Sequence, residues 1–226
     1  MKKLIVLSGA GMSAESGIRT FREMGGLWEE YDVMEVASPI GWKKHPEVVL
    51  EFYNQRRKQL LECSPNAGHT GLSALEKHFD MHIITQNVDD LHERAGSSRI
   101  LHLHGELRKA ESIYDKRLVY DIDGWELKMG DKCEKGYQLR PHVVWFGEAV
   151  TAMEEAVQIA QTADIFVVIG TSLNVYPAAG LVDYVPDNVP LYLIDPGEFN
   201  LRRDVTHIQK GASEGVKELA EMLLKN

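Results

Sequence analysis

The chain has little of what secreted, membrane-spanning or nucleic-acid-binding proteins need. Two cysteines in 226 residues, Cys63 and Cys133, cannot build a disulfide framework, so we expect both thiols to be free. Lys and Arg total 25 against 34 Asp and Glu, and the net charge of -9 gives no attraction to phosphate backbones or anionic membranes. No apolar run approaches the ~20 residues that span a bilayer, and the run at 4–7 enters a glycine turn without a cleavage site. These absences predict a cytoplasmic protein with neither nucleic acid nor membrane as a partner.

Short apolar runs that end in glycine or a polar turn alternate with helical patterns. The runs cover residues 4–7, 81–85, 165–169 and 190–194. Helices are predicted at 151–162 and 215–224. This order favours an α/β fold, a Rossmann-like doubly wound parallel sheet with helices on both faces. With 44% hydrophobic residues, the chain can bury such a core and still carry a smaller inserted domain.

Two stretches do not follow this alternation and are assigned to the smaller domain. Residues 24–64 have mostly helical patterns, with Pro46 suited to a first helical turn. Residues 106–141 are charged and irregular without a good core strand, and a hairpin is predicted around Asp123-Gly124. The Rossmann-like part then comprises about residues 1–23, 65–105 and 142–226.

A glycine-rich turn follows the first predicted strand. Residues 9–14 satisfy the pattern G-x-G-x-x-(G/A), whose glycines let the backbone approach a pyrophosphate. Alone, the pattern fits a strand-to-helix turn without a ligand equally well. A dehydrogenase would place an acidic residue at the end of a second strand about 20 positions later, and residues 25–32 are not a strand end. A simple Rossmann dehydrogenase is therefore the poorer interpretation.

The wider segment at 9–22 resembles the NAD-binding signature of the sirtuin family. Similar blocks follow in order: PNAGH at 65–69, TQNVDDLH at 85–92, HLHG at 102–105, RPHVVWFGE at 140–148, and GTS at 170–172 with VYPA at 175–178. Because they span nearly the whole chain, the chain is identified as a member of this family. The resemblance implies NAD as the cofactor and acyl-lysine-bearing proteins as the substrates.

The resemblance also implies where NAD binds. Most blocks follow an apolar run, and open α/β sheets bind ligands at the carboxyl ends of their strands. Gln86, Asn87 and Asp89 offer groups suited to ribose hydroxyls and a carboxamide, although each alone would also fit a buried structural residue. Asp195 stands where many sirtuins have Asn, and it can still accept from ribose hydroxyls. The full set assigned to NAD is Gly9, Ala10, Gly11, Ser13, Ala14, Phe21, Arg22, Trp28, Gln86, Asn87, Val88, Asp89, Gly170, Thr171, Ser172, Asp195, Pro196, Gly197 and Ala212.

Two histidines are candidates for the catalytic base. His102 and His104 would point to one face of an extended segment, so their spacing does not choose between them. A near-neutral pKa makes histidine the usual general base, although a lone histidine is more often structural. The resemblance selects His104, directly before Gly105. In the family's mechanism this residue removes a ribose hydroxyl proton, and the products are nicotinamide and O-acyl-ADP-ribose.

Sirtuins commonly hold a structural zinc with four cysteines, and this chain departs from that pattern. Only Cys133 lies in the expected region and Cys63 is distant in sequence, so four thiolate ligands are impossible. We therefore predict no metal. The smaller domain would instead depend on the predicted hairpin and on a small apolar core of Ile113, Tyr114, Val119, Ile122 and Trp125.

The segment FYNQRR at 52–57 resembles the Tyr-x-x-Arg element of the sirtuin branch that removes succinyl and malonyl groups. Tyr53 and Arg56 would share one helical face and could together hold an acyl carboxylate, whereas without the resemblance a solvated helix face would explain them better. The resemblance further implies that an apolar run pairs with the substrate backbone, for which buried-strand packing is the alternative. The residues of this run are Val144, Trp145, Phe146 and Gly147.

The resulting hypothesis is NAD-dependent removal of acyl groups, succinyl and malonyl as well as acetyl, from protein lysine side chains. Two alternatives stay open. One is an ADP-ribosyltransferase that uses the same NAD pocket, against which Tyr53 and Arg56 argue. The other is a non-catalytic module that binds NAD or ADP-ribose, against which the presence of His104 with Asn87 and Asp89 argues.

Overall fold

The computed structural model describes residues 1–18, 31–171, 178–198 and 204–225, and within them the predicted parallel sheet is present. Its six strands lie in the spatial order β3-β2-β1-β7-β8-β9, and every neighbouring pair is parallel. Their bounds are β1 Lys3–Ser8, β2 Asp80–Thr85, β3 Ile100–His102, β7 Ile165–Ile169, β8 Leu191–Ile194 and β9 Thr206–Ile208. This is the Rossmann strand order, which reverses direction between β1 and β7.

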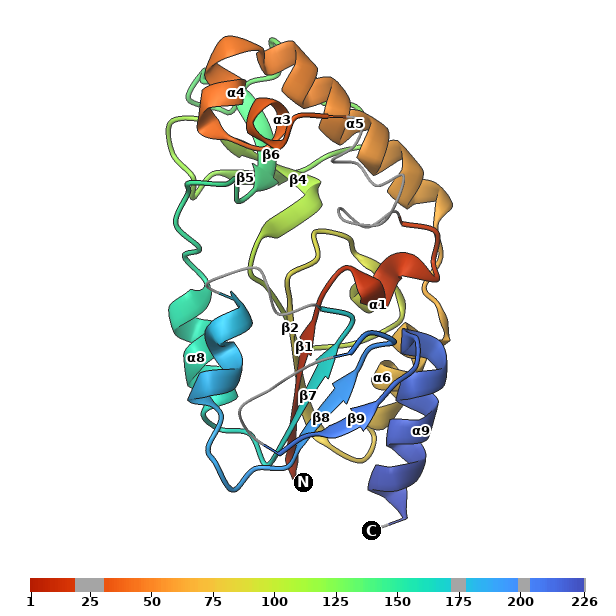
Figure 1. Ribbon diagram of the computed structural model, residues 1–226. Coiled ribbons are helices and arrows are strands. Elements are labelled where there is room, and N and C mark those ends of the chain that lie inside the picture. The colour runs from red at the N-terminus through yellow and green to blue at the C-terminus, as the bar shows by residue number, and fades with distance from the viewer. Residues whose placement is uncertain (19–30, 172–177, 199–203, 226) are drawn as a thin grey trace.

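Helices cover both faces of this sheet because its central strands are hydrophobic on both sides. In β1, Leu4 and Val6 belong to one core, and the residues that alternate with them belong to the other. Figure 1 shows α6 and α9 beside one face and α8 beside the other. The covering elements are α6 Ala67–Leu75 and α9 Ala212–Leu224 for the first core, and α8 Met153–Ala160 and the 3-10 helix η1 Ala178–Tyr184 for the second. The predicted doubly wound α/β fold is confirmed.

A smaller antiparallel sheet and three helices form the upper part of the molecule in Figure 1. The strands lie in the order β5 Val119–Asp121, β4 Gly105–Ser112 and β6 Leu139–Val143. The helices are α3 Val33–Val36, α4 Pro39–Lys44 and α5 Pro46–Glu62. Pro46 stands in the first turn of α5, as predicted. An apolar core that includes Phe52, Leu107 and Val143 joins α5 to this sheet.

Two expectations about the smaller sheet are wrong. Strand β5 pairs with β4 and not with residues 125–127, so Asp123-Gly124 does not close a hairpin, although Gly124 has a φ of 71°. Residues 106–141 also contain a core strand, because Leu107 and Ala110 of β4 are buried. The register of β4 against β6 shifts between Gly105 and Ala110. This irregularity interrupts the two-residue alternation and hides the strand from the sequence pattern.

The small apolar core also differs from the predicted one. Of the five predicted members only Ile122 is buried. The core that forms contains Leu50, Ala110, Ile122 and Leu127. Asn54 of α5 supports it, because its amide nitrogen donates to the Leu127 carbonyl at 3.0 Å and its Oδ1 accepts from the Leu127 N–H at 2.9 Å. Helix α5 therefore supplies packing that the sequence pattern assigned to a hairpin.

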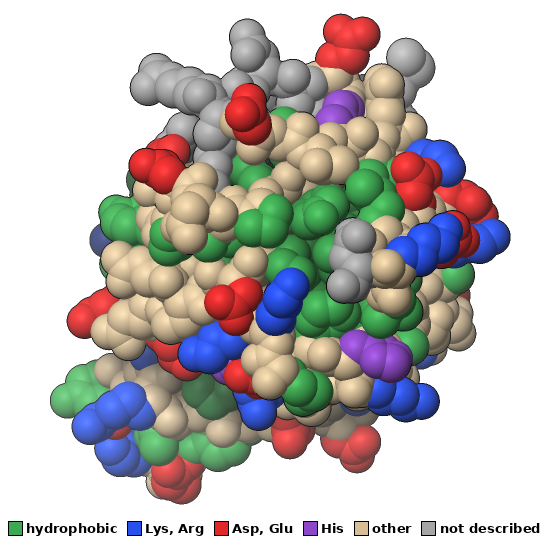
Figure 2. Space-filling model, turned by 90° about the horizontal axis from the view of Figure 1, so that it is seen from below, with side chains coloured by type: hydrophobic (Ala, Val, Ile, Leu, Met, Phe, Trp, Pro, Cys, Tyr) green, Lys and Arg blue, Asp and Glu red, His purple; other side chains and the backbone are tan. Residues whose placement is uncertain are grey.

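Figure 2 shows the face opposite the smaller sheet, near both ends of the chain, where hydrophobic side chains gather and charged side chains lie mainly around them. This face lies at the amino ends of the parallel strands, away from the glycine turns. None of the helices in the described ranges is both long and apolar enough to cross a bilayer. Two short helices complete the described elements that bear on the site, α1 Gly11–Ala14 and α7 Leu91–Arg94.

Candidate functional site

The two glycine turns assigned to NAD meet where the strand order reverses. Gly9 follows β1, Gly170 follows β7, and the Gly11 N–H donates to the Gly170 carbonyl at 2.8 Å. A Cβ on Gly9 would lie 2.6 Å from the Cβ of Thr171, and a Cβ on Gly170 would lie 2.3 Å from the Met12 nitrogen. Gly170 also has a φ of 60°. Only glycine permits this approach, and it leaves bare backbone for a ligand to contact.

A buried polar cluster joins α1 to the end of β2. The Ser13 hydroxyl donates to Asp89 Oδ2 at 2.9 Å and accepts from Asn87 Nδ2 at 3.1 Å. Asp89 Oδ1 accepts from the Leu91 N–H at 3.2 Å. Burial raises the pKa of Asp89, and the Ser13 hydrogen bond opposes that rise. The structure thus brings together three predicted cofactor residues from separate parts of the sequence.

Gln86 offers an unpaired donor near the glycine turns. Its Oε1 accepts from the Thr171 hydroxyl at 3.4 Å, while its Nε2 is shielded from solvent and has no partner in the described part of the chain. A buried amide without a partner costs ~1–3 kcal/mol, a cost that a bound ligand with an acceptor removes. The bare glycine backbone and this donor fit the phosphates and polar groups of NAD.

The hydrogen bonds distinguish the two histidines. His102 uses both ring nitrogens, Nδ1 at 2.9 Å from the Asn87 carbonyl and Nε2 at 2.8 Å from Glu93 Oε1. His104 places Nδ1 at 3.0 Å from the Gln86 carbonyl, and no partner of its Nε2 occurs among the described residues. Burial lowers the pKa of His104, whereas for His102 the bond to Glu93 outweighs burial and raises the pKa. A neutral His104 that donates from Nδ1 keeps Nε2 as a proton acceptor.

The apolar run assigned to the substrate follows β6 and contacts His104. The Val144 N–H donates to the His104 carbonyl at 2.9 Å. Phe146 is 50% exposed, so this run is not a fully buried strand. The N–H groups of Val144, Trp145 and Phe146 already donate within the chain, while that of Gly147 has no partner in the described part. A substrate backbone would therefore find a free donor at Gly147 and not along the whole run.

Tyr53 and Arg56 lie one turn apart on α5, as predicted. Tyr53 is 2% exposed, and its hydroxyl oxygen accepts from Trp145 Nε1 at 3.1 Å. Arg56 is half-buried as a residue, and its guanidinium carbon lies 5.5 Å from the centre of the Phe52 ring. Burial lowers the pKa of Arg56, and the nearby Tyr53 and Asp89 oppose this effect. Arg56 is therefore within electrostatic range of both Tyr53 and Asp89 of the polar cluster.

The remaining predicted cofactor residues lie further along the sheet or outside the described ranges. Asp195 follows β8, and its Oδ1 accepts from the Gly197 N–H at 2.8 Å beside the exposed Pro196. Among the described residues, no hydrogen bond links Asp195 to the Ser13 cluster. Ala212 is buried at the start of α9. Phe21, Arg22, Trp28 and Ser172 lie outside the described residues.

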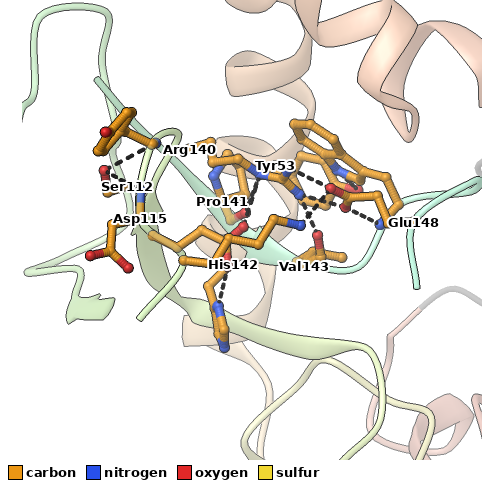
Figure 3. Close-up of polar contacts among 12 residues, drawn as sticks. Tyr53, Ser112, Asp115, Arg140, Pro141, His142, Val143 and Glu148 are labelled. Carbon is orange, nitrogen blue, oxygen red and sulfur yellow. Dashed lines mark hydrogen bonds and ion pairs between the residues drawn. The ribbon is translucent and has the colours of Figure 1, made fainter. Parts of the chain in front are cut away.

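The sequence patterns did not reveal an ion pair that contacts Trp145 of the apolar run. Both terminal nitrogens of Arg140 donate to the Glu148 carboxylate, each at 2.9 Å. Glu148 Oε2 accepts from the Trp145 N–H at 2.9 Å, and the Arg140 guanidinium lies 3.4 Å from the centre of the Trp145 ring. Figure 3 shows Arg140 and Glu148 pointing toward each other. Arg140 and Glu148 are the two ends of the 140–148 block. Their opposite charges on either side of an apolar run were the sequence signal that could have indicated the ion pair.

Other contacts are present in the region where sirtuins commonly have zinc cysteines. Cys133 is buried, and its sulfur lies 3.5 Å from the Ser112 hydroxyl oxygen. Asp115 accepts from Lys135 Nζ at 3.1 Å. The described ranges contain no group of three or more His, Cys, Asp or Glu side chains that could hold a metal ion. Cys63 and Cys133 are both free thiols.

Comparison with known proteins decides the family. A model of the Sir2 family matches residues 9–177, which is most of the chain. The chain belongs to the Sir2 family. NAD-dependent protein deacylases from Bacteroides thetaiotaomicron and Helicobacter pylori are 57% and 54% identical to this Sir2 chain. The first match covers 99% of each protein, and the second covers 100% of this chain and 97% of the relative.

Solved Sir2 structures agree with this assignment. A mutant Sir2 homologue in complex with ADP-ribose has a TM-score of 0.91 and covers 99% of this chain and 92% of its own. A Sir2 homologue in complex with NAD has a TM-score of 0.89 and covers 99% and 90%. Both are 38% identical to this chain. The sirtuin resemblance is confirmed, and NAD, the cofactor of the Sir2 family, is confirmed with it. The roles of individual residues and the preferred acyl group stay predictions.

Proposed function

We propose that this Sir2 protein removes acyl groups from protein lysine side chains, consumes NAD, and yields nicotinamide and O-acyl-ADP-ribose. The observation that carries the proposal is the arrangement of His104. Its Nδ1 is bound to the Gln86 carbonyl, its Nε2 has no partner in the described part of the chain and can act as a base, and its own carbonyl accepts from the run that would meet the substrate. The similarity to NAD-dependent protein deacylases supports the same activity.

Different residues of the chain have different roles in this reaction. When bound, NAD supplies the ribose carbon that the acyl oxygen attacks and the hydroxyl that receives the acyl group. The glycines at 9, 11 and 170 allow the backbone to approach its phosphates, and Gln86 Nε2 offers a donor. The hydrogen bond between Asn87 and Ser13 holds the two side chains in place close to the glycine backbone. His104 Nε2 takes the ribose hydroxyl proton, and its lowered pKa keeps it neutral at pH 7.

The preferred acyl group, in this proposal, ends in a carboxylate. The Tyr53 hydroxyl accepts from Trp145 and keeps its own hydrogen for donation, and Arg56 contributes a planar charged donor one turn away. In a partly dehydrated site, a charge-assisted bond to a carboxylate is stronger than one to a neutral group. An acetyl group has no carboxylate, so it cannot form this charge-assisted bond with Tyr53 or Arg56. Malonyl and succinyl groups are therefore the better substrates.

A product assay by mass spectrometry tests the proposal on matched acetyl-, malonyl- and succinyl-lysine peptides, each with and without NAD. We expect NAD-dependent loss of the acyl group with appearance of acyl-ADP-ribose, most efficiently from malonyl and succinyl peptides. A peptide that gains ADP-ribose and keeps its acyl group would identify a transferase instead. NAD binding without any product would identify a sensor. Faster turnover of acetyl-lysine would reject only the acidic preference.

A further inference from the structure

We infer that Trp145 is a specificity-determining residue, because its indole N–H orients the hydroxyl of Tyr53 toward the acyl carboxylate. The inference rests on the proposed acidic-acyl preference. The hydrogen bond from Trp145 Nε1 to the Tyr53 hydroxyl oxygen is 3.1 Å long. Each of the two side chains is 2% exposed, so water does not readily replace the indole as the donor.

This hydrogen bond restricts the direction in which the Tyr53 hydroxyl can point its hydrogen. A phenolic oxygen can donate one hydrogen and accept through its lone pairs, and the hydrogen rotates toward whichever acceptor is present. When the indole donates to the oxygen, the hydroxyl hydrogen must point elsewhere, which leaves it for a ligand acceptor. An accepted hydrogen bond also polarises the O–H group and strengthens the bond that it donates. Trp145 therefore prepares Tyr53 to donate and not to accept.

Trp145 itself is held firmly enough to serve this role. The guanidinium of Arg140 lies over its ring, and the ring of Trp42 lies 5.7 Å away between centres. Its backbone N–H is fixed by Glu148, whose carboxylate is bound by Arg140. Figure 3 shows Tyr53 drawn beside the Arg140–Glu148 pair. The Arg140–Glu148 ion pair thus fixes the position of the Trp145 indole, and the indole in turn orients the Tyr53 hydroxyl.

The effect should depend on the acyl group. A succinyl or malonyl tail has a carboxylate that accepts the oriented hydrogen, whereas an acetyl tail has none. Loss of a neutral hydrogen bond inside a protein corresponds to about a 2- to 12-fold change at ~1.4 kcal/mol per factor of ten. We therefore expect a Trp145 variant without the N–H to lower the ratio of succinyl to acetyl kcat/KM by about that factor.

A double-mutant cycle on the full chain tests this coupling. The four proteins are the unmodified chain, Trp145→Phe, Tyr53→Phe and the double variant, each assayed with succinyl- and acetyl-lysine peptides. Each single variant should lower the succinyl-to-acetyl ratio of kcat/KM. The double variant should lower it no further than Tyr53→Phe alone, because no hydroxyl remains for the indole to orient. A residue that only supports the fold would affect both substrates alike.

Replacing Trp145 with 3-benzothienylalanine, which exchanges the N–H for sulfur and keeps the ring shape, provides a second variant if Trp145→Phe does not fold. Melting temperature and NAD affinity are measured on every variant. If Tyr53→Phe lowers the ratio and neither Trp145 variant does, the inference is overturned and the proposed function stands. If the unmodified chain shows no preference for succinyl-lysine and Tyr53→Phe leaves the ratio unchanged, the proposed acidic-acyl preference fails, and the inference fails with it.

Discussion

The Nδ1 atom of His104 lies 3.0 Å from the carbonyl oxygen of Gln86, and none of the described residues provides a hydrogen-bond partner for Nε2 of the same ring. Because general-base catalysis contributes ~100-fold or more, His104→Ala should lose most turnover while it keeps its fold and NAD binding. Steady-state deacylation and calorimetric NAD titration measure the two effects. The exposed His78 offers a matched control, and His78→Ala should behave like the unmodified chain. Near-normal deacylation by His104→Ala would reject its role as base.

Arg56→Met keeps an apolar stem and removes the charged fork that we propose binds the acyl carboxylate. A hydrogen bond to a charged group is worth ~1.5–3 kcal/mol, so succinyl-lysine kcat/KM should fall roughly 10- to 150-fold. Acetyl-lysine has no carboxylate to lose and should not share this fall. Tyr53→Phe should reproduce the pattern more weakly. Lys58→Met removes an exposed cation from the same helix and serves as the control. Equal losses on both substrates in the Arg56 and Tyr53 variants would withdraw the acidic-acyl preference.

Gly170→Ala and Gly124→Ala separate backbone strain from close packing. Both glycines have a positive φ, 60° and 71°, so either alanine should cost ~1–2 kcal/mol of unfolding free energy. Only the Cβ at 170 would also meet backbone, 2.3 Å from the Met12 nitrogen, whereas no atom of the described residues lies within 4 Å of a Cβ at 124. Gly170→Ala should therefore unfold at a lower temperature and bind NAD more weakly than Gly124→Ala. Equal NAD affinities in the two variants would contradict the glycine cradle as the cofactor site.

The Glu148 carboxyl should make stability depend on acid pH. Burial alone would raise its pKa, but its bonds to Arg140, Lys116 and the Trp145 N–H lower the pKa from 4.5 to about 2. A carboxyl whose folded pKa is lowered stabilises the fold above its unfolded pKa and loses that contribution as the pH falls from about 4.5 toward 2. Glu148→Gln should therefore cost up to about 3.5 kcal/mol of unfolding free energy at pH 7, at ~1.4 kcal/mol per pKa unit, and less at pH 3.

Urea unfolding of the unmodified chain and of Glu148→Gln at pH 7 and pH 3 measures how the cost of the substitution depends on pH. Glu126→Gln is the control, because Glu126 pairs with Lys128 at the surface and such pairs are worth ~1 kcal/mol or less. A cost of Glu148→Gln that is the same at both pH values would show that the substitution acts through packing and not through charge.

Purified protein should contain no stoichiometric zinc by elemental analysis, and a chelator should leave its melting temperature unchanged. With two cysteines in the chain, four thiolate ligands cannot be assembled. Contacts such as Cys133 with Ser112 and Asp115 with Lys135 lie in the region that zinc would otherwise hold. One tightly held zinc per chain would show that the smaller sheet depends on a metal after all.

Most of the parallel sheet could be predicted because its central strands are buried on both faces and so appear as continuous apolar runs. The runs at 4–7, 81–85, 165–169 and 190–194 correspond to β1, β2, β7 and β8. Strands β3 and β9 have three residues each and carry too short a pattern to identify. Strand β4 changes register partway, so its buried residues do not alternate regularly.

The sequence by itself determined the parallel sheet, the sirtuin blocks and the candidate residues, because these are recorded in residues that follow one another along the chain. Only the tertiary structure shows that the rings of His102 and His104 have different partners, because the carbonyl groups that they contact belong to Asn87 and Gln86, beyond the end of β2. It also placed Trp145 against Tyr53, 92 residues apart, and left four of the five residues of the predicted small apolar core unburied. Hydrogen-bond partners so distant in sequence are chosen by how the two sheets and α5 pack together, and no local pattern records that packing.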